Sequence, residues 1–488
     1  MKTLMKFKKV NIVFILVLCS TLYSQICFER FYGGEQTDTG SEVIQTADGG
    51  YLFSAYSTSY GPGLDVLLIR TDPGGDTLWT RVYGGSGDDM AEGIVQTDDG
   101  GYAILVATSS KGAGGLDYSI LKINSDGDLL WEKTYGGSRD DCCFSIDYTN
   151  DGGFIMAGYQ VTASSMDIYI VKVDHNGNQE WDKVLSQDVY NFARYIIQTS
   201  DGGYVYTGYI SSGNPNVRSL LIGKIDADGN TVWTRTSSGG EIDFGFCIQE
   251  TSENEYIIAG RTTSYGAGDS DVYLVKADNE GHIQWYKTYG GPKRDLVFSI
   301  VQTDDGGYAM AGITESYGQG PSDVYLLRTD SNGDTLWTRT FGGDYKDESY
   351  DLTQTSDEGF AIVGGHYFLE ALTEKAQLYL IKTDNAGTVT GVKPIQYHNT
   401  PKQFVLKNNY PNPFNTTTQI RYQLKKQCEV KLSILNISGQ VLTTIVSGMQ
   451  PAGIYQYEWN AANFPTGTYF CRIVADHDMD TKKLIYLK

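Results

Sequence analysis

One pattern of short strands and turns recurs seven times along this chain. Each copy carries an aromatic residue directly after a tight turn, in most copies a turn with paired glycines. These aromatics are Tyr51, Tyr102, Phe154, Tyr204, Tyr256, Tyr308 and Phe360, at steps of 50 to 52 residues. A fixed period of this size, built from short strands, is typical of a β-propeller or a related array. Such a fold is a scaffold, so we expect function to lie in loops that differ between repeats.

Each repeat predicts four strands joined by tight turns. In the second copy we expect them at residues 90–97, 102–108, 117–123 and 129–135. The third strand is apolar on both faces in most copies, which indicates burial on both sides. We therefore predict an all-β protein: a seven-bladed β-propeller with four-stranded blades, followed by a small C-terminal β-sandwich. The expected limits are 1–24 for a signal peptide, 25–390 for the propeller, 391–403 for a linker and 404–488 for the sandwich.

The repeat is out of phase with the chain, and this predicts how the ring closes. Six copies carry a tryptophan in the fourth strand, which we expect to pack between neighbouring blades. These are Trp79, Trp131, Trp181, Trp233, Trp285 and Trp337. The chain begins with a lone fourth strand in which Phe28 takes the tryptophan position, whereas the seventh repeat has Gly391 there. We predict that the N-terminal strand completes the last blade and removes an exposed sheet edge. The alternative is that residues 388–392 fill this place.

Composition and the N-terminus limit the surroundings in which the protein works. The first 24 residues combine a basic start with an apolar run that is too short to span a membrane, as in a secretory signal. No later stretch is apolar over membrane length, so we expect no transmembrane segment after cleavage. The net charge of −21 argues against nucleic acid or an anionic membrane as partner. We expect a secreted or cell-surface protein, and a monomer.

The chain offers little recognisable catalytic chemistry. No histidine has a metal-ligand partner at short spacing and no nucleophile motif is evident, so we predict no catalytic residue and leave enzymatic activity open. Six cysteines follow the leader, and none recurs with the repeat. Cys428 and Cys471 are the candidate disulfide pair, with buried thiols as the alternative.

Two acidic series recur on one face of the predicted ring. The first lies four residues after a glycine pair and comprises Asp38, Asp89, Asp141, Asp295 and Asp347. The second begins the third strands and comprises Asp65, Asp117, Asp167, Asp271 and Asp323, while the fourth repeat has Ser219. These carboxylates either accept hydrogen bonds from loop amides or bind calcium, which is the one cofactor we consider.

A basic series ends the third strands. It comprises Arg70, Lys122, Lys172, Lys224, Lys276, Arg328 and Lys382. Because one position is basic in all seven copies, a structural pairing with a local aspartate fits it better than a single active site does.

The loops after the second strands differ most between repeats. Their exposed aromatics Tyr60, Tyr265 and Tyr317 are our candidate ligand-binding residues, because aromatic faces can stack on sugar rings. The alternative is that these equivalent tyrosines only pack their own loops.

The C-terminal residues carry a family resemblance. The motif residues are Asn409, Tyr410, Pro411, Asn412, Pro413, Phe414, Asn415, Gly439, Gly453, Tyr455, Gly467, Tyr469, Lys482 and Lys483. In this order they resemble the type A sorting domain of the type IX secretion system, with Thr416 where the family often has proline. The resemblance implies export to the periplasm, then passage through the outer membrane by the secretion machinery. The repeats themselves resemble those of bacterial extracytoplasmic seven-bladed propeller proteins.

These observations favour a binding function. We expect the propeller to bind a polysaccharide, or a surface or matrix protein, outside the cell. One alternative is a polysaccharide lyase or glycoside hydrolase acting in the central funnel, and another is a structural surface protein without a small ligand. Polar residues present in one or two blades only, and converging on the axis, would favour the enzyme.

Overall fold

A computed structural model gives the fold of two separate units, which divide at residues 394 and 395. The residues described are 26–34, 36–162, 165–185, 190–211, 213–214, 216–370, 373–389, 404–407, 409, 411–424, 426–436, 440–475 and 478–487. The predicted signal peptide and linker lie outside them. Within these ranges every element is a strand, and no helix is long and apolar enough to cross a membrane.

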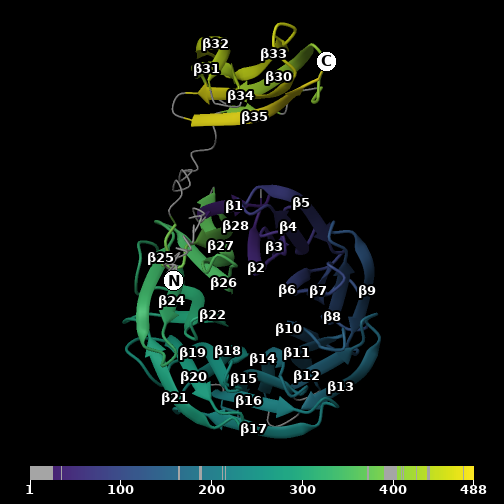
Figure 1. Cartoon of the computed structure of the whole chain (residues 1–488), viewed down its shortest axis with the longest axis vertical. Helices are drawn as coiled ribbons and strands as arrows, with labels where there is room; N and C mark the ends of the chain where they lie inside the picture. The colour runs from purple at the N-terminus through teal and green to yellow at the C-terminus, as the bar shows by residue number, and fades with distance from the viewer. Residues whose placement is uncertain are drawn as a thin grey trace, which may run out of the picture. The chain divides into compact units, whose positions relative to one another are not determined.

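The described part of the first unit contains seven four-stranded antiparallel blades arranged around a ring (Figure 1), two of which are joined into one sheet by a single parallel pair, Met166 with Tyr190. The innermost strands are β2 (Asp38–Gln45), β6 (Asp89–Gln96), β10 (Asp141–Tyr148), β14 (Tyr190–Gln198), β18 (Asp243–Glu250), β22 (Asp295–Gln302) and β26 (Lys346–Gln354). The second strands are β3 (Tyr51–Ser57), β7 (Tyr102–Thr108), β11 (Phe154–Val161), β15 (Tyr204–Ser211), β19 (Tyr256–Thr262), β23 (Tyr308–Thr314) and β27 (Phe360–Glu370).

The outer half of each blade completes the sheet and forms the rim of the ring. The third strands are β4 (Asp65–Thr71), β8 (Asp117–Ile123), β12 (Met166–Val173), β16 (Ser219–Ile225), β20 (Asp271–Ala277), β24 (Asp323–Thr329) and β28 (Thr373–Thr383). The fourth strands are β5 (Thr77–Tyr83), β9 (Leu129–Tyr135), β13 (Gln179–Leu185), β17 (Thr231–Ser237), β21 (Ile283–Tyr289), β25 (Thr335–Phe341) and β1 (Phe28–Tyr32). The first unit is therefore the predicted seven-bladed propeller.

The N-terminal strand closes the ring, as predicted. β1 pairs antiparallel with β28, with Phe28 opposite Lys382 and Tyr32 opposite Leu378. The last blade thus combines the first strand of the chain with β26, β27 and β28. Every blade then has four strands, and the outer edge of β28 is paired rather than exposed.

Neighbouring blades are joined by the fourth-strand aromatics. Trp131 meets Phe154 of the next blade edge to face, with ring centroids 6.4 Å apart. Trp131 also covers Gly177 in the turn before β13 of that next blade, where a Cβ atom would lie 2.7 Å from the indole. Gly177 has a φ of 74°, so the turn needs glycine for its backbone as well as for this contact. Phe28 repeats the arrangement against Tyr51 and Gly75, which confirms the predicted inter-blade role.

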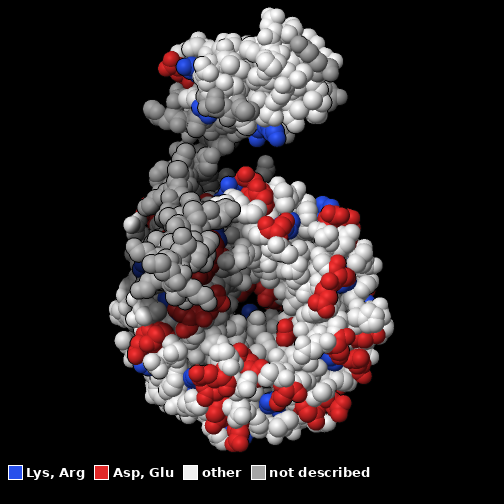
Figure 2. All heavy atoms as spheres, in the orientation of Figure 1, with Lys and Arg blue, Asp and Glu red and all other residues white. Residues whose placement is uncertain are grey.

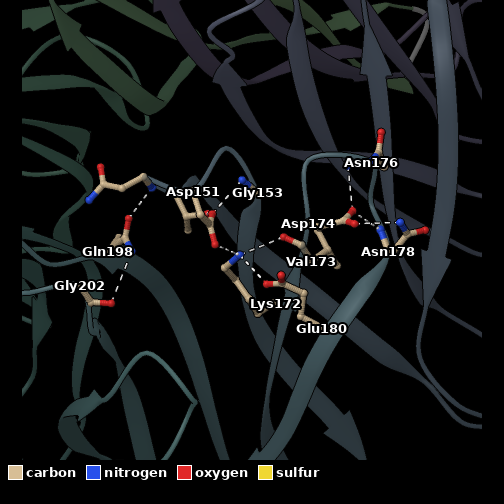
Figure 3. A network of polar contacts seen from close by, with 12 residues as sticks. Asp151, Gly153, Lys172, Val173, Asp174, Asn176, Asn178, Glu180, Gln198 and Gly202 are labelled. Carbon is tan, nitrogen blue, oxygen red and sulfur yellow. Dashed lines mark hydrogen bonds and ion pairs between the residues drawn. The ribbon is translucent and has the colours of Figure 1, made fainter.

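The basic residue at the end of each third strand binds the acidic residue of a turn in the same blade. Lys172 is the clearest case, with its Nζ atom 2.8 Å from Asp151 and 2.9 Å from Glu180 (Figure 3). The other pairs are Arg70–Asp48, Lys122–Asp99, Lys224–Asp201, Lys276–Glu253, Arg328–Asp305 and Lys382–Asp357. The hydrogen bond from Lys224 is the main reason that the pKa of Asp201 falls to about 2. The predicted structural pairing is confirmed.

The second unit is a sandwich of two sheets. One contains β29 (Phe404–Leu406), β30 (Thr417–Leu424) and β33 (Gly453–Asn460), and the other contains β31 (Cys428–Leu435), β32 (Val441–Gln450), β34 (Gly467–Ala475) and β35 (Asp478–Tyr486). Cys471 lies opposite Ile434, six residues along β31 from Cys428. At about 3.3 Å per residue this separates the cysteines far beyond the ~7 Å that a disulfide allows. The candidate pairing of Cys428 with Cys471 is therefore wrong, and both side chains belong to the buried core.

Closure predicts that a single aromatic at the N-terminus carries much of the stability of the ring. Phe28→Ala should lower the free energy of unfolding by about 3 kcal/mol, because a buried ring is lost between two blades. Ile26→Ala is the control: Ile26 is 52 % exposed and should change stability by less than about 0.5 kcal/mol. Denaturant unfolding of both variants provides the measurement, and equal stabilities would contradict closure through Phe28.

Candidate functional site

Each innermost strand carries a β-bulge at the same repeat position. The pairing register shifts there in all seven blades, between residues 40 and 42 in the first and at the equivalent places in the others. The bulged residues are Ser41, Glu92, Phe144, Arg194, Phe246, Phe298 and Tyr350. All seven line one cavity of about 220 Å³. A bulge re-aims its side chain and is a common device beside functional sites, so we take this axial cavity as the candidate site.

The backbone of this position repeats, but its side chains do not. Serine, glutamate, arginine, tyrosine and three phenylalanines occupy one and the same place in seven blades. Each lies ten residues before the aromatic that marks its repeat, for example Ser41 before Tyr51. The sequence therefore contained the signal, but only the register of the sheets shows that these seven residues meet. The cavity has the blade-to-blade asymmetry that a specific site requires.

An arc of aromatic rings forms one side of the site, from the third blade to the seventh. Successive ring centroids lie 4.3 to 5.7 Å apart through Phe144, Phe192, Tyr209, Phe244, Phe246, Phe298 and Tyr350. Contacts at this spacing are favourable stacked, tilted or edge-to-face pairs. The arc gives the cavity an apolar wall, and its members Phe144, Phe246, Phe298 and Tyr350 face the enclosed volume.

Carboxylates form the other side, in the seventh, first and second blades. Asp351 accepts hydrogen bonds from the Ser299 hydroxyl at 2.7 Å and from the amide of Val43 at 2.9 Å. Glu42 likewise accepts a hydrogen bond from the amide of Ile94 in the next blade. Both residues follow a bulge and satisfy an N–H group on the free edge of the neighbouring innermost strand. Their first role is therefore to hold adjacent blades together.

Glu92 differs because it is itself a bulged residue that lines the cavity. Its carboxylate lies 3.8 Å from the Arg194 guanidinium, and that guanidinium lies over the Phe144 ring at 4.6 Å. Burial raises the pKa of Glu92 to about 7, although Arg194 opposes the shift. Burial also raises the pKa of Asp351 to about 6 and that of Glu42 well above its ordinary value, the latter with repulsion from Asp351. Figure 2 shows acidic and basic atoms inside the hollow at the centre of the ring.

The predicted acidic residues hold the loops on one face of the ring. Asp38, Asp89, Asp141, Asp243, Asp295 and Asp347 each accept the amide hydrogen of the glycine four residues earlier. Asp117, Asp271 and Asp323 each accept two loop amides, and Asp167 accepts the Ser165 hydroxyl. Asp243 was missed because its loop has a glycine pair displaced by one residue. Asn191 takes the equivalent buried place in the fourth blade.

Calcium binding by these aspartates stays a prediction. They come together in pairs from adjacent blades, such as Asp117 and Asp141 on either side of Gly136. Among the described residues no group of three or more acidic, histidine or cysteine side chains has the arrangement of a metal site. Calcium needs several oxygen ligands, so a pair would have to be completed by water or by ligand oxygens.

The three candidate tyrosines lie in separate blades. A Cβ atom on Gly34 would lie 3.6 Å from the Tyr60 ring, one on Gly239 would lie 2.8 Å from the Tyr265 ring, and one on Gly291 would lie 3.3 Å from the Tyr317 hydroxyl. Each ring thus covers a glycine of the loop that enters its own blade. Tyr317 also donates to the carbonyl of Gly290 at 2.8 Å. Their repeated packing fits a loop-supporting role, and their binding role stays a prediction.

The C-terminal motif ties the start of its domain to the last strand. The Asn412 side chain donates to the Lys483 carbonyl at 3.0 Å and accepts the Ile485 amide at 2.8 Å. Phe414 is buried and stacks on Tyr486 with centroids 5.3 Å apart. Of the other motif residues, Asn409 bonds Pro411 and Thr418, Tyr455 stacks on Tyr422, Tyr469 donates to Pro465 and Lys483 is exposed. Tyr410 and Gly439 lie outside the described residues.

Comparison with known families identifies this second unit. Residues 408–487 match the family model described as secretion system C-terminal sorting domain. This part of the chain is a sorting domain. The match agrees with the resemblance read from the motif, and a sorting domain of this kind indicates secretion. Such a domain implies an interaction with secretion machinery.

Comparisons that involve the propeller give only distant similarities. Regulatory protein FlaEY of Caulobacter vibrioides is 28 % identical over 162 residues, which cover 28 % of this chain but only 17 % of that protein. The Pan2 WD40 domain of Neurospora crassa is 11 % identical, covering 72 % of this chain and 91 % of its own, with a TM-score of 0.45. Polysaccharide lyase Uly1 is 10 % identical with the same coverage and a TM-score of 0.44. The propeller assignment itself rests on the seven blades of this chain.

The raised pKa of Glu92 predicts a pH-dependent stability. Between its ordinary value of 4.5 and about 7, the folded protein binds more protons at this residue than the unfolded chain does. Glu92 therefore makes the folded state less stable as the pH rises through that window. Glu92→Gln should raise the melting temperature at pH 8 and leave it nearly unchanged at pH 4, as measured by thermal unfolding.

The control for this measurement is a residue whose pKa is lowered by folding rather than raised. Asp201→Asn should lower the melting temperature at pH 7, and the difference should shrink as the pH falls from about 4 towards about 2, because the pKa of Asp201 is lowered. If Glu92→Gln instead lowered the melting temperature at pH 8, its ion pair with Arg194 would outweigh its burial.

Proposed function

We propose that this protein is a secreted binding module whose axial cavity holds part of an extracellular polysaccharide, or of a surface or matrix protein. The observation that carries the proposal is the bulged position at the ring axis. The tryptophan contacts and the basic–acidic pairs repeat from blade to blade, whereas the seven bulged residues differ and face a common volume. A scaffold that keeps its frame and varies one set of converging side chains is suited to specific recognition.

The two sides of the cavity suit a ligand with both apolar faces and hydroxyl or cationic groups. Phe246 and Phe298 offer ring faces for stacking, and Glu92 offers an acceptor in a partly enclosed place. The volume of about 220 Å³ is smaller than the ~300 Å³ at which pockets for whole drug-sized ligands begin. The cavity therefore takes one ring or one side chain of a larger partner, with the remainder lying across the face of the ring.

A lyase or glycoside hydrolase is the second candidate, and Glu92 is the observation that favours it. A carboxyl group with a pKa of about 7 is half protonated at neutral pH and suits general acid or base catalysis. Asp351, with a pKa raised to about 6, lines the same cavity. In this alternative the same ligand is cleaved after it binds.

The sorting domain predicts a clear export phenotype. A chain truncated after residue 403 should fold its propeller and accumulate in the periplasm. Phe414→Ser should have the same effect, because it places a hydroxyl in the core that joins the motif to β35. Ile454→Ser is the control, since Ile454 is 77 % exposed. Immunoblots of periplasm and medium provide the measurement, and normal release of the truncated chain would contradict the sorting role.

A screen with two sets of variants locates the binding site. The mature chain is screened on a glycan array and against matrix proteins, and Phe298→Ala should weaken binding of any hit at least tenfold by removing the middle of the aromatic wall. The triple variant Tyr60→Ala, Tyr265→Ala and Tyr317→Ala should bind normally. The reverse result would place the ligand on the loops after the second strands. If the native protein shortens a bound polysaccharide and Glu92→Gln does not, the protein is an enzyme instead.

A further inference from the structure

Three arginines from consecutive blades gather beside the aromatic arc. Arg218 precedes β16, Arg261 lies near the end of β19 and Arg294 precedes β22, so all three are on the face that carries the loops after the second and fourth strands. The guanidinium carbon of Arg218 lies 5.3 Å from the Phe244 ring centroid, and that of Arg261 lies 4.9 Å from the same centroid. Arg218 is also 5.0 Å from the Tyr209 ring. Two positive charges therefore share one aromatic ring.

These two arginines lack the counter-charge that several other arginines of the propeller have. Arg294 pairs with Glu315 at 3.3 Å, and Arg70 and Arg328 each pair with an aspartate. In the described part of the chain, the side chains of Arg218 and Arg261 form no ion pair. The Nε atom of Arg261 is buried and has no hydrogen-bond partner there. This is notable in a chain with 59 acidic and 38 basic residues, where carboxylates are the more abundant charge.

Stacking on Phe244 explains how the arginines are held, but not why the Nε donor of Arg261 has no partner among the described residues. Burial, with repulsion from Arg294 and Arg218, lowers the pKa of Arg261, so the cluster costs free energy in the unliganded protein. A guanidinium group offers a planar fork of donors that matches carboxylate and sulfate oxygens. An anionic group placed between the two guanidinium groups would satisfy the donors and relieve the repulsion.

We propose that Arg218 and Arg261 bind a carboxylate or sulfate group of the extracellular ligand, which makes an acidic polysaccharide the ligand class. This deepens the proposed binding function and rests on it. Phe244 connects the arginine pair to the cavity, because it stacks with Phe246 at 5.7 Å and 7°, and Phe246 lines the cavity. An anionic group at Phe244 and a sugar ring at Phe246 are therefore neighbouring parts of one bound chain.

Three polymers with a common backbone test the charge requirement. The mature full-length chain is titrated with carboxymethyl-dextran, dextran sulfate and neutral dextran by isothermal calorimetry at low and moderate salt. We expect binding to at least one of the two anionic polymers, weakened by salt, and at least tenfold weaker binding to neutral dextran. The preferred anionic polymer distinguishes carboxylate from sulfate recognition. Equal affinity for neutral dextran, or no binding to either anionic polymer, would overturn the proposal.

Variants then locate the site. Arg218→Gln combined with Arg261→Gln should weaken binding to the preferred anionic polymer at least tenfold, with each single change weaker in effect. Arg235→Gln is the matched control, because it removes one charge from a guanidinium that stacks at 5.6 Å on Trp233 in the rim strand β17. It should change affinity less than twofold. Unchanged affinity in the double variant would overturn the proposal.

Two further measurements separate loss of the anionic subsite from unfolding and from failure of the binding function as a whole. Thermal unfolding shows whether each variant is folded. If the double variant is unfolded, the affinities of the two single variants test the proposal. Loss of binding in Phe298→Ala with no loss in the arginine variants would leave the binding function standing and reject the anionic subsite alone.

Discussion

The contact between one blade's fourth strand and the next blade's turn is the interaction on which the propeller depends. An aromatic ring from each rim strand lies over a glycine with positive φ, as Trp131 lies over Gly177. In five of the seven contacts between described residues the ring also pairs with the aromatic that marks the next repeat, as Trp131 does with Phe154. Each aromatic pair contributes about 1 kcal/mol beyond its burial. Because the contacts run head to tail, the ring is stable only if the last one is made, and Phe28 makes it from the other end of the chain.

At the axis of the ring the innermost strand of every blade has a free edge, so its backbone N–H groups need partners from outside the sheet. Several of its backbone N–H groups are satisfied by side chains of the preceding blade. Asp351 reaches Val43, Glu42 reaches Ile94, and the Ser145 hydroxyl accepts the Ile196 amide. Within the described chain, the side chain of the bulged residue beside each of these does not hydrogen-bond to the next blade and lines the axial cavity instead. The side chains that join the blades and those that line the candidate site are therefore adjacent residues on the same strand.

That separation accounts for the mixed chemistry of the axial cavity. Carboxylates gather where the seventh, first and second blades meet, while aromatic rings continue through the third to seventh blades. Arginines stack on that aromatic arc, and Arg194 joins the two sides through Glu92 and Phe144. Burial raises the pKa of the acids, and the two arginines on the arc, Arg218 and Arg261, form no ion pair with the described residues. Both features are costly for an unliganded scaffold and support the proposed ligand, which would carry complementary groups.

The sequence by itself determined the blades, their order, the closing strand and the sorting domain. These follow from local signals: the 50 to 52-residue period, the turn glycines, the Phe28 strand without a partner in its own repeat and the motif that begins at Asn409. It also indicated the basic–acidic pairs, because both partners recur in every blade. Only the tertiary structure decided which residues share the axis, since Ser41 and Tyr350 are far apart in the chain and become neighbours when the ring closes. It likewise excluded the Cys428–Cys471 disulfide through strand register and placed Asp243 in a series that residue counting missed. The repeat allows the local geometry of each blade to be predicted from its sequence. The meeting of seven bulged side chains at the axis depends on long-range closure of the ring.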